Sequence, residues 1–524
     1  MGVYFNPSNI GFSYSKRSKI YVDKSGLISY TNSVLMTEQM YICVSRPRRF
    51  GKTMAAKMLT AYYSRNCDSK DLFKDLKIAQ DPSFEEHLNH YNVIFLNIQQ
   101  FLSESSGIED MISNINSTVN GSILEVYPEI QRNSVKENIT VILQRLFELT
   151  EIPIIFIIDE WDCIFREYKT DISTQRIYLD FLRNLLKDRE YIGLAYMTGI
   201  LPIKKYGTHS ALNMFNEFSM TDPRELTEFT GFTKTEVINL CDKYQMDYDE
   251  VSRWYDGYSF RKVKSVYNPK SVVEALLSRH CNNYWSKTET YEALSIYFKT
   301  DYDGLKDTII QLLAGEKKKV DIRSFTNDMV TFESYNDVLT LLIHLGYLGY
   351  DFETEEVFIP NKEISDEFVT AVKVTSWNEI TTALRASEDL LNATWLGDAG
   401  KVAQYIEAAH NETPLIKYND ENALSCIVSI AYYSAREYYT LVREMPAGKG
   451  FADLVFLPRK NHLDKPAMII ELKWDKTAAG AIRQIEDKQY YEIINEYKDN
   501  ALLVGISYNR DTKRHECMIK RFTS

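Results

Sequence analysis

The C-terminal part of the sequence carries acidic and basic residues whose spacing fits metal-assisted phosphodiester hydrolysis. Glu471 and Lys473 lie two residues apart, so on a strand their side chains would point to one face. A hairpin partner over Ala452–Leu457 would bring Asp453 beside them. Carboxylates can hold a hard cation that polarises a phosphoryl oxygen, and an ammonium group can orient the nucleophile. We therefore predict that Asp453, Glu471 and Lys473 are catalytic, with both carboxylates as metal ligands.

Three further residues could complete this site. Glu421, on a helix before the strands, could join the acidic cluster as a metal ligand, while Gln484 and Tyr490, on the helix after them, could steady the lysine or contact a nucleic-acid backbone. The alternative is a half-exposed hairpin whose polar residues face solvent. The helix-strand-strand-strand-helix order around these residues favours a nuclease-type site that uses Mg²⁺, or Mn²⁺.

A second group of residues that could perform chemistry follows the apolar run Met40–Ser45. Gly51, Lys52 and Thr53 stand there at the start of a helical pattern. A phosphate-binding loop needs backbone N–H groups around the phosphates, a lysine that reaches the terminal phosphates and a hydroxyl for magnesium. Arg46 takes the place of the motif's usual first glycine, and a plain basic turn before a helix is the alternative interpretation.

We predict ATP contacts along the whole of this loop. The residues are Arg46, Arg48, Arg49, Phe50, Gly51, Lys52 and Thr53. Thr53 is also a predicted magnesium ligand.

Acidic residues at the end of a later apolar run support the same function. Asp159 and Glu160 follow Ile154–Ile158. At the carboxyl end of a sheet strand, Asp159 would hold the magnesium shell and Glu160 would polarise the attacking water. Taken alone, such an acidic pair is more often a solvated turn. Thr198 ends the next apolar run, where a residue that contacts the γ-phosphate would lie, although simple turn chemistry accounts for it equally well.

These residues need a sheet to position them, and the first 200 residues have the pattern of one. Four short apolar runs alternate with helical patterns: Met40–Ser45, Val93–Asn97, Ile154–Ile158 and Ile192–Met197. Such continuous runs are typical of parallel strands buried on both faces, with crossover helices between them. The sequence therefore predicts an α/β fold with an N-terminal parallel sheet.

The pattern changes twice further along the chain. Helical periodicity dominates the middle, at Thr233–Tyr244, Pro269–Leu277, Tyr302–Leu313 and Asp337–Leu345. Strand-like runs then return at Tyr438–Val442, Ala452–Leu457, Ala467–Leu472 and Ala501–Ser507. We predict domains at residues 1–230, 231–414 and 415–524, of which the last is a small α/β domain.

Composition limits the class of protein. The 524 residues are 44% hydrophobic and 26% charged, as in soluble globular proteins. The seven cysteines form no Cys-x-x-Cys pair, and the sequence has neither a secretory pattern nor an apolar run of about 18 residues. We therefore expect a cytoplasmic protein without a membrane segment. The net charge of −12 means that any nucleic-acid contact must be local.

Several segments together resemble a known family. They are Tyr21–Lys24, Arg46–Thr53, Ile158–Asp162, Thr198–Ile200, Trp254–Tyr258, Val266–Pro269, Gly450–Asp453 and Glu471–Lys473. The chain resembles the bacterial AAA-ATPase-like proteins that carry a C-terminal PD-(D/E)XK nuclease domain. The resemblance spans nearly the whole chain and implies a P-loop NTPase domain, a helical lid or linker and a nuclease-like domain. It also implies that Arg46 is the family's normal variant of the loop.

The leading functional hypothesis is an ATP-dependent enzyme that cleaves DNA or RNA, because the residues for both chemistries are present. The alternative is a nucleotide-gated switch or scaffold that binds nucleic acid or a partner without cutting it. The sequence identifies no arginine finger acting in trans, which keeps this alternative open. Multiple-turnover phosphate release would separate the two hypotheses.

Overall fold

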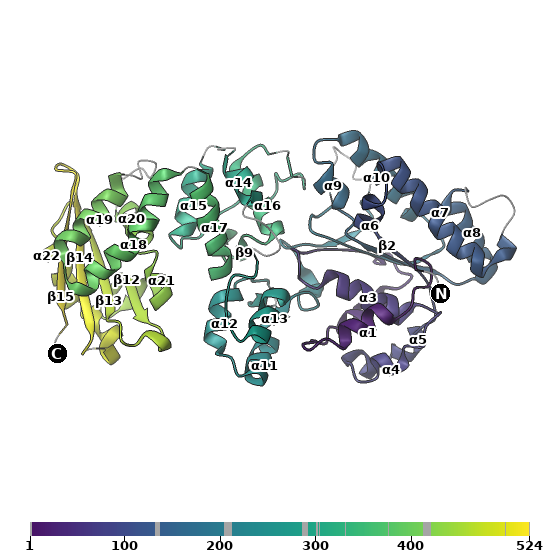
Figure 1. Ribbon diagram of the computed structural model, residues 1–524, viewed down its shortest axis with the longest axis horizontal. Coiled ribbons are helices and arrows are strands. Elements are labelled where there is room, and N and C mark those ends of the chain that lie inside the picture. Colours follow the sequence, from purple (N-terminus) through teal and green to yellow (C-terminus); the bar gives the residue numbers. More distant parts are fainter. Residues whose placement is uncertain are drawn as a thin grey trace. The chain divides into compact units, whose positions relative to one another are not determined.

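The computed structural model describes residues 3–130, 137–203, 212–261, 263–285, 292–299, 302, 304–327, 329–330, 332–375, 377–411, 421–497 and 499–522. The chain forms two compact units. The first comprises Met1–Thr288 with Lys319–Ile364, and the second comprises Glu289–Lys318 with Ser365–Ser524. Figure 1 shows the chain coloured along the sequence.

A five-stranded parallel sheet lies at the centre of the first unit. Its strands, in spatial order, are β2 (Asn92–Asn97), β3 (Ile154–Asp159), β4 (Ile192–Gly199), β1 (Tyr41–Ser45) and β5 (Asn216–Phe218). Every residue of β1, β3 and β4 is buried. β4 lies between β1 and β3, so the carboxyl ends of these three strands are neighbours.

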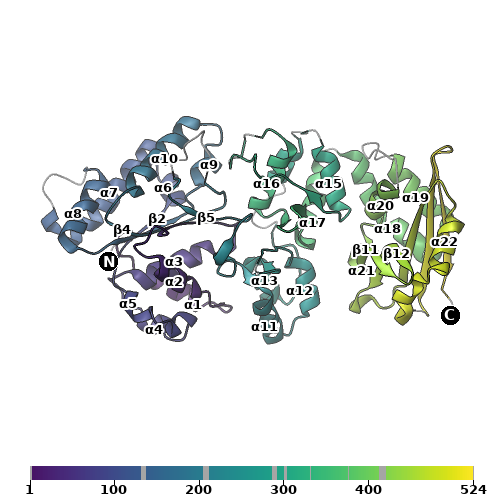
Figure 2. The same cartoon turned by 180° about the vertical axis from the view of Figure 1, so that it is seen from behind.

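Helices cover both faces of this sheet (Figure 1 and Figure 2). One layer contains α1 (Ile10–Lys16), α2 (Gly26–Val34), α3 (Lys52–Tyr63), α4 (Lys70–Phe73) and α5 (Phe84–His87). The other contains α6 (Ile98–Ser103), α7 (Ile108–Val126), α8 (Ile139–Thr150), α9 (Cys163–Glu167) and α10 (Ile172–Leu186). The sheet is thus the middle of three layers, as its continuous apolar strands require.

The four strands predicted in this region are confirmed, but β5 was not predicted. Its three residues, Asn216–Phe218, pair with β1, and two of them are only half-buried. A segment this short and polar has no strand periodicity of its own. Its place in the sheet depends on the neighbouring strand.

The rest of the first unit consists of helices and short paired strands. They are α11 (Lys234–Tyr244), α12 (Tyr248–Tyr255), α13 (Pro269–Ser278), α16 (Tyr335–Leu345), β6 (Phe232–Thr233), β7 (Val266–Tyr267), β9 (Gly349–Asp351) and β10 (Glu356–Phe358). Local signals begin two of these helices. Thr233 and Glu236 form a capping box at α11, and Asn268 caps α13, which begins with Pro269. β8 (Lys318–Lys319) and α17 (Lys362–Val374) include the residues at which the chain passes between the units.

A second five-stranded sheet organises the second unit. Its order is β11 (Tyr439–Ala447), β12 (Gly450–Pro458), β13 (Ala467–Trp474), β14 (Ala501–Asn509) and β15 (Arg514–Arg521). Only β13 and β14 pair in parallel; the other neighbours are antiparallel. The helices are α14 (Glu292–Lys299), α15 (Leu305–Leu313), α18 (Asn378–Leu396), α19 (Ala399–Asn411), α20 (Glu421–Ala431), α21 (Ala435–Tyr438) and α22 (Ala478–Asp487), with the 3₁₀ segment η5 at Tyr490–Tyr497.

In this unit the sheet separates α18, α19 and α20 on one face from α22 on the other (Figure 2). The strands predicted at the C-terminus are confirmed as β11 to β14, whereas β15 was missed. Its alternating residues are mostly exposed and charged, so the sequence lacks the apolar face that marks a strand. Antiparallel pairing with β14 holds it in the sheet.

The division into two units passes through the predicted middle domain rather than along its borders. Residues 231–288 and 319–364 belong to the first unit, and residues 289–318 and 365–414 to the second. The border at residues 414/415 lies outside the described residues. The three-domain division therefore stays a prediction.

Two findings concern the chain as a whole. All seven cysteines are free thiols. None of the helices in the described part of the chain combines the length and apolar character needed to cross a membrane.

Candidate functional sites

The loop after β1 has the geometry of a phosphate-binding loop. β1 is buried throughout, and α3 begins at Lys52, directly after the loop. Gly51 caps the helix with φ of 89°, a left-handed conformation that favours glycine. The free N–H groups of the first turn of α3 and the helix dipole therefore lie at the loop, where an anion is stabilised.

A cavity of about 580 Å³ adjoins this helix end. Predicted residues that line it are Arg48, Arg49, Phe50, Gly51, Lys52, Thr53 and Glu160. The sequence interpretation did not assign Tyr21, Lys24, Phe229 and Lys270, which also line it. The cavity thus joins basic side chains beside α3 to an apolar wall, the combination that a nucleotide's polyphosphate and base require.

Lys52 is buried beneath the loop. Its Nζ donates to the backbone oxygens of Arg46 and Pro47, at 2.9 Å each. Burial lowers the pKa of Lys52, whereas Glu160 acts in the opposite direction. The lysine therefore stiffens the loop while remaining beside the cavity.

Asp159 and Thr198 meet at the ends of β3 and β4. Thr198 Oγ1 donates a hydrogen bond to Asp159 Oδ1, and both side chains are buried. Asp159 Oδ2 has no hydrogen-bond partner among the described residues. An orphaned buried carboxylate oxygen next to a phosphate-binding loop fits a magnesium ligand, either directly or through water. Neither side chain lines the cavity itself.

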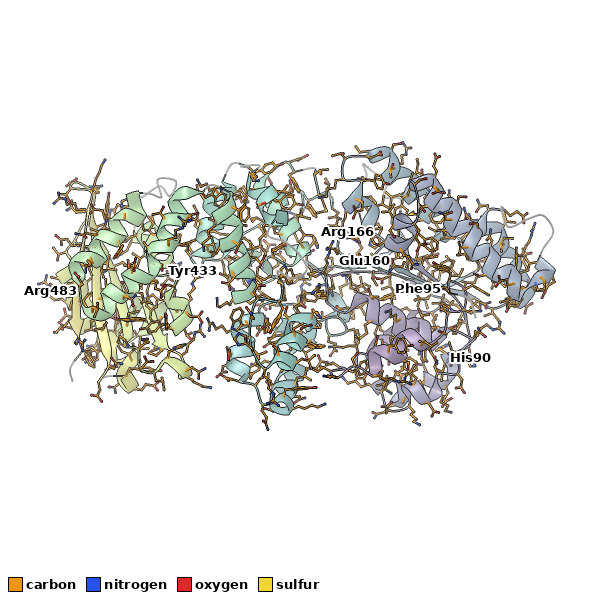
Figure 3. The ribbon with its side chains drawn as sticks, in the orientation of Figure 1. His90, Phe95, Glu160, Arg166, Tyr433 and Arg483 are labelled. Carbon is orange, nitrogen blue, oxygen red and sulfur yellow. The ribbon has the colours of Figure 1, made fainter. Side chains whose placement is uncertain are left out.

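Glu160 is held by an arginine. Arg166 Nη2 donates to Glu160 Oε2 at 2.5 Å, and Figure 3 labels both residues. Arg166 Nε lies 3.5 Å from Asp162 Oδ2. Burial raises the pKa of Glu160, while Lys52 and Arg166 lower it. The residue has φ of 56°, which a non-glycine residue adopts at some energetic cost. Surrounding contacts must therefore maintain this turn.

Arg46 does not lie where a contact with ATP in this cavity, as predicted from the sequence, would need it. It is fully buried and does not line the cavity. Its Nη1 donates to the backbone oxygens of Ser45 and Phe218 at 2.8 Å, and its guanidinium lies 5.5 Å from the ring centroid of Phe260. Burial lowers its pKa to about 10. The arginine at the usual glycine position thus joins β1 to β5.

Phe50 differs from the other cavity residues in the loop. Its ring is buried and packs edge-on against Tyr258, with 5.3 Å between the centroids. The Tyr258 hydroxyl donates to the Gly346 oxygen at 2.6 Å. Phe50 therefore anchors the loop to the short elements after the sheet.

In the second unit, β12 and β13 bring the predicted acidic and basic residues together. Asp453 Oδ2 accepts a hydrogen bond from the Leu472 N–H at 2.7 Å. Lys473 Nζ lies 2.9 Å from Glu471 Oε1 and 3.5 Å from Glu421 Oε1. Because β12 and β13 are antiparallel neighbours, the three catalytic candidates share one end of the hairpin.

The predicted supporting residues adjoin the same cluster. Gln484 Nε2 donates to Glu471 Oε1 and approaches the Tyr490 hydroxyl at 3.3 Å. A β-carbon on Gly450 would lie 2.6 Å from that hydroxyl, so the close approach of Tyr490 to β12 requires glycine there. The chain Tyr490–Gln484–Glu471 orients the buried carboxylate.

The pKa values of the residues in this cluster are shifted by burial and by their charged neighbours. Burial, and then Asp453, raise the pKa of Glu471 to about 7. Burial also raises the pKa of Asp453. Burial opposes the charge on Lys473, but the hydrogen bond to Glu471 and the charges of the neighbouring carboxylates together outweigh it, and the pKa of the lysine is raised. The site therefore holds carboxylates whose charges a positive ion would stabilise.

The predicted metal ligands do not form a complete cage within the described residues of the chain. In the part of the chain that the structure describes, no three His, Cys, Asp or Glu side chains are grouped so that they could hold a metal ion. Glu421 approaches Lys473 rather than joining such a group. Glu471 Oε2 is buried and has no hydrogen-bond partner among the described residues, which fits a ligand position. The donor set therefore suits a magnesium ion that keeps several waters.

Several residues beside the sites escaped the sequence interpretation. Lys24 Nζ binds Glu236 Oε2 at 2.6 Å at the edge of the cavity, and Arg166 holds Glu160. Lys24 lies in a segment that resembles the family, which was a usable signal. Arg166 lies four residues after Asp162 on α9, a spacing that on a helix permits an ion pair.

Comparisons with known proteins match the two parts of the chain that contain these candidate sites. Residues 13–208 match the family described as predicted AAA-ATPase, and residues 419–517 match the PD-(D/E)XK nuclease superfamily. An uncharacterized protein in the vnfD 5′ region of Azotobacter chroococcum is 22% identical over 517 residues, which are 94% of this chain and 93% of the relative.

Solved structures give weaker similarities. The Walker-type ATPase of Pyrococcus abyssi aligns with a TM-score of 0.36 and 12% identity over 68% of this chain and 97% of that one. The ORC2 protein of Aeropyrum pernix aligns with a TM-score of 0.24 and 11% identity over 68% and 97%. On the family matches, this chain carries a predicted AAA-ATPase domain at residues 13–208 and a PD-(D/E)XK nuclease superfamily domain at residues 419–517.

Proposed function

We propose that this protein binds and hydrolyses ATP in its first unit and cleaves phosphodiester bonds of nucleic acid in its second. The observation that carries the proposal is that each unit groups its own set of residues suited to phosphate chemistry. The cavity at α3 contains Lys52 and Glu160, and the β12–β13 hairpin unites Asp453, Glu471 and Lys473.

ATP fits the first cavity by charge and by shape. Lys52, Arg48 and Arg49 line it beside the N-terminus of α3, so the polyphosphate would meet both formal charges and backbone N–H groups. Apolar side chains such as Phe229 and Val273 line the same cavity and suit a purine base.

Hydrolysis requires a base or a polarising group for water. Glu160 is the acidic residue that lines the cavity, and its side chain retains 25% exposure. Asp159 and Thr198 lie behind it at the ends of neighbouring strands. We assign Glu160 the orientation of the attacking water, Asp159 and Thr53 the magnesium shell, and Thr198 the support of Asp159.

In the second unit the residues divide the work of phosphodiester hydrolysis. Lys473 places an ammonium group beside Glu471, where it can orient a nucleophilic water and stabilise the charge of the transition state. Gln484 fixes Glu471, and Asp453 is fixed by the backbone of β13. Magnesium held by Asp453 and Glu471 would lower the pKa of a bound water and polarise the phosphoryl oxygen.

The expected partner is DNA or RNA, bound locally because the whole chain is acidic. Seven free thiols support the proposed cytoplasmic location.

The decisive experiment uses the purified full chain with Mg²⁺ or Mn²⁺ on single-stranded DNA, duplex DNA and RNA, with ATP present or absent. We expect metal-dependent cleavage and multiple-turnover phosphate release. If the protein binds ATP and nucleic acid but neither hydrolyses ATP nor cleaves nucleic acid, the alternative of a nucleotide-gated switch is favoured over an enzyme. An Asp453→Asn protein prepared in the same way controls for a contaminating nuclease.

A further inference from the structure

Glu160 belongs to a chain of charged contacts that continues beyond the cavity. Arg166, from α9, donates to its carboxylate at 2.5 Å and has only 9% of its own side chain exposed. The same guanidinium lies 3.5 Å from Asp162, which is completely buried. Arg166 therefore connects the partly exposed carboxylate of Glu160 to the buried carboxylate of Asp162.

Asp162 is fixed because it accepts two backbone hydrogen bonds. The N–H groups of Ile200 and Leu201 donate to its Oδ2 at 3.0 and 2.8 Å. These residues directly follow β4, whose Thr198 contacts Asp159. Asp162 therefore holds Arg166 at the end of β4, the same strand end that supports Asp159, the predicted magnesium ligand.

Glu160 needs such support for a physical reason. Its backbone has φ of 56°, and its side chain faces the cavity with 25% exposure. A glutamate in that position would otherwise sample several rotamers, and each would place the carboxylate differently relative to a bound water. A misplacement of about 1 Å at a reacting group can cost about 100-fold in rate.

We propose that Arg166 is the positioning residue of ATP hydrolysis: it holds the Glu160 carboxylate against the cavity and ties it through Asp162 to the end of β4. The inference rests on the proposed hydrolysis of ATP. Arg166 does not line the cavity and pairs directly with Glu160, so we expect its effect on hydrolysis to pass through that carboxylate.

The test compares Arg166→Met, Arg166→Lys and Glu160→Gln with the double variant, each as the full chain. Arg176→Met is the matched control, because this arginine is exposed on the next helix, α10. We expect Arg166→Met to lower kcat about 10- to 100-fold while KM and the Kd for a non-hydrolysable ATP analogue change by less than about threefold. Arg166→Lys should restore part of kcat.

The double variant separates positioning from general stability. If Arg166 acts through Glu160, adding Arg166→Met to Glu160→Gln should lower kcat by less than about twofold, because the group to be positioned is already gone. Additive losses, an equal loss of analogue binding, unchanged kcat or faster hydrolysis in Arg166→Met would each overturn the inference. If the wild-type protein itself does not hydrolyse ATP, the proposed hydrolysis is wrong, and the inference about Arg166 is wrong with it. That result differs from the others, which require an active wild-type protein.

Discussion

Lys473 Nζ lies 2.9 Å from Glu471 Oε1, although the two residues belong to the same strand. Their contact follows from the two-residue period of β13, and Glu421 at 3.5 Å places a second carboxylate on the same ammonium. A lysine that is mostly buried and surrounded by acids has little freedom to move. Substitutions of these residues can therefore test the second site separately from the first.

Replacing Lys473 with alanine should abolish cleavage, by at least about 100-fold, because the nucleophile loses its orienting charge and Glu471 loses its partner. ATP binding should be unchanged, since the nucleotide cavity belongs to the other unit. Gel assays of cleavage and calorimetry of ATP binding measure the two effects. Lys476→Ala is the control, because Lys476 is exposed three residues away. Equal cleavage by both variants would place the activity elsewhere.

Lys52→Ala should weaken ATP binding at least about tenfold, because it removes the buried cation at the start of α3. Glu160→Gln should keep the affinity and slow turnover about 100-fold or more. Lys57→Ala, exposed on the same helix, controls for a general change of charge. An unchanged affinity in Lys52→Ala, measured by calorimetry, would remove the phosphate-binding assignment.

Gly199→Ala tests the tight packing at the end of β4. A β-carbon there would lie 2.6 Å from Trp161 Nε1 and 2.7 Å from Asp162 Oδ1, so the turn that holds Glu160 must shift. We expect a loss of about 1–3 kcal/mol in the free energy of unfolding together with reduced ATP hydrolysis. Gly121→Ala is the matched control, because nothing lies within 4 Å of its β-carbon and its helix should become slightly more stable. Similar urea midpoints for both variants would contradict the crowding at Gly199.

The second unit should lose stability in mild acid because of two histidines. Burial lowers the pKa of His410 from 6.5 to about 4 and that of His515 to about 3. Their ring centroids lie 5.0 Å apart, on α19 and β15. Because the unfolded chain binds protons near pH 6.5 and the folded chain does not, the stabilisation is complete above that pH and falls as the pH drops towards 4.

Urea unfolding at a series of pH values measures this effect, with a loss of about 2 kcal/mol for each histidine, and so about 4–5 kcal/mol in all, expected between pH 7 and pH 4.5. The double variant His410→Gln, His515→Gln should show a shallower dependence on pH, whatever its stability at pH 7. The same slope in wild type and variant would assign the acid sensitivity to other groups.

Local pattern was sufficient for much of this molecule. The buried strands β1, β3 and β4 are continuous apolar runs, so the sequence predicts their burial on both faces. The loop before α3 and the pair Glu471 and Lys473 could be predicted because each depends on residues that are neighbours along the chain. Their predicted chemistry rests on residue type and spacing alone.

Other features depend on contacts between distant segments. β5 is a strand because β1 offers it hydrogen bonds, and β15 because β14 does. Arg46 turns inward to the Phe218 carbonyl, which lies 172 residues later, and so leaves the cavity to other side chains. Sequence spacing cannot predict such partners, because the direction of a long side chain is decided by what packs around it.

The sequence by itself determined which groups could do chemistry and on which kind of element each would lie. The tertiary structure decided how those groups are held: Arg166 on Glu160, and Gln484 on Glu471. The physical reason is that the strand and helix periods are local, whereas the orientation of a buried charge is set by hydrogen bonds and ion pairs that form only after distant segments have packed.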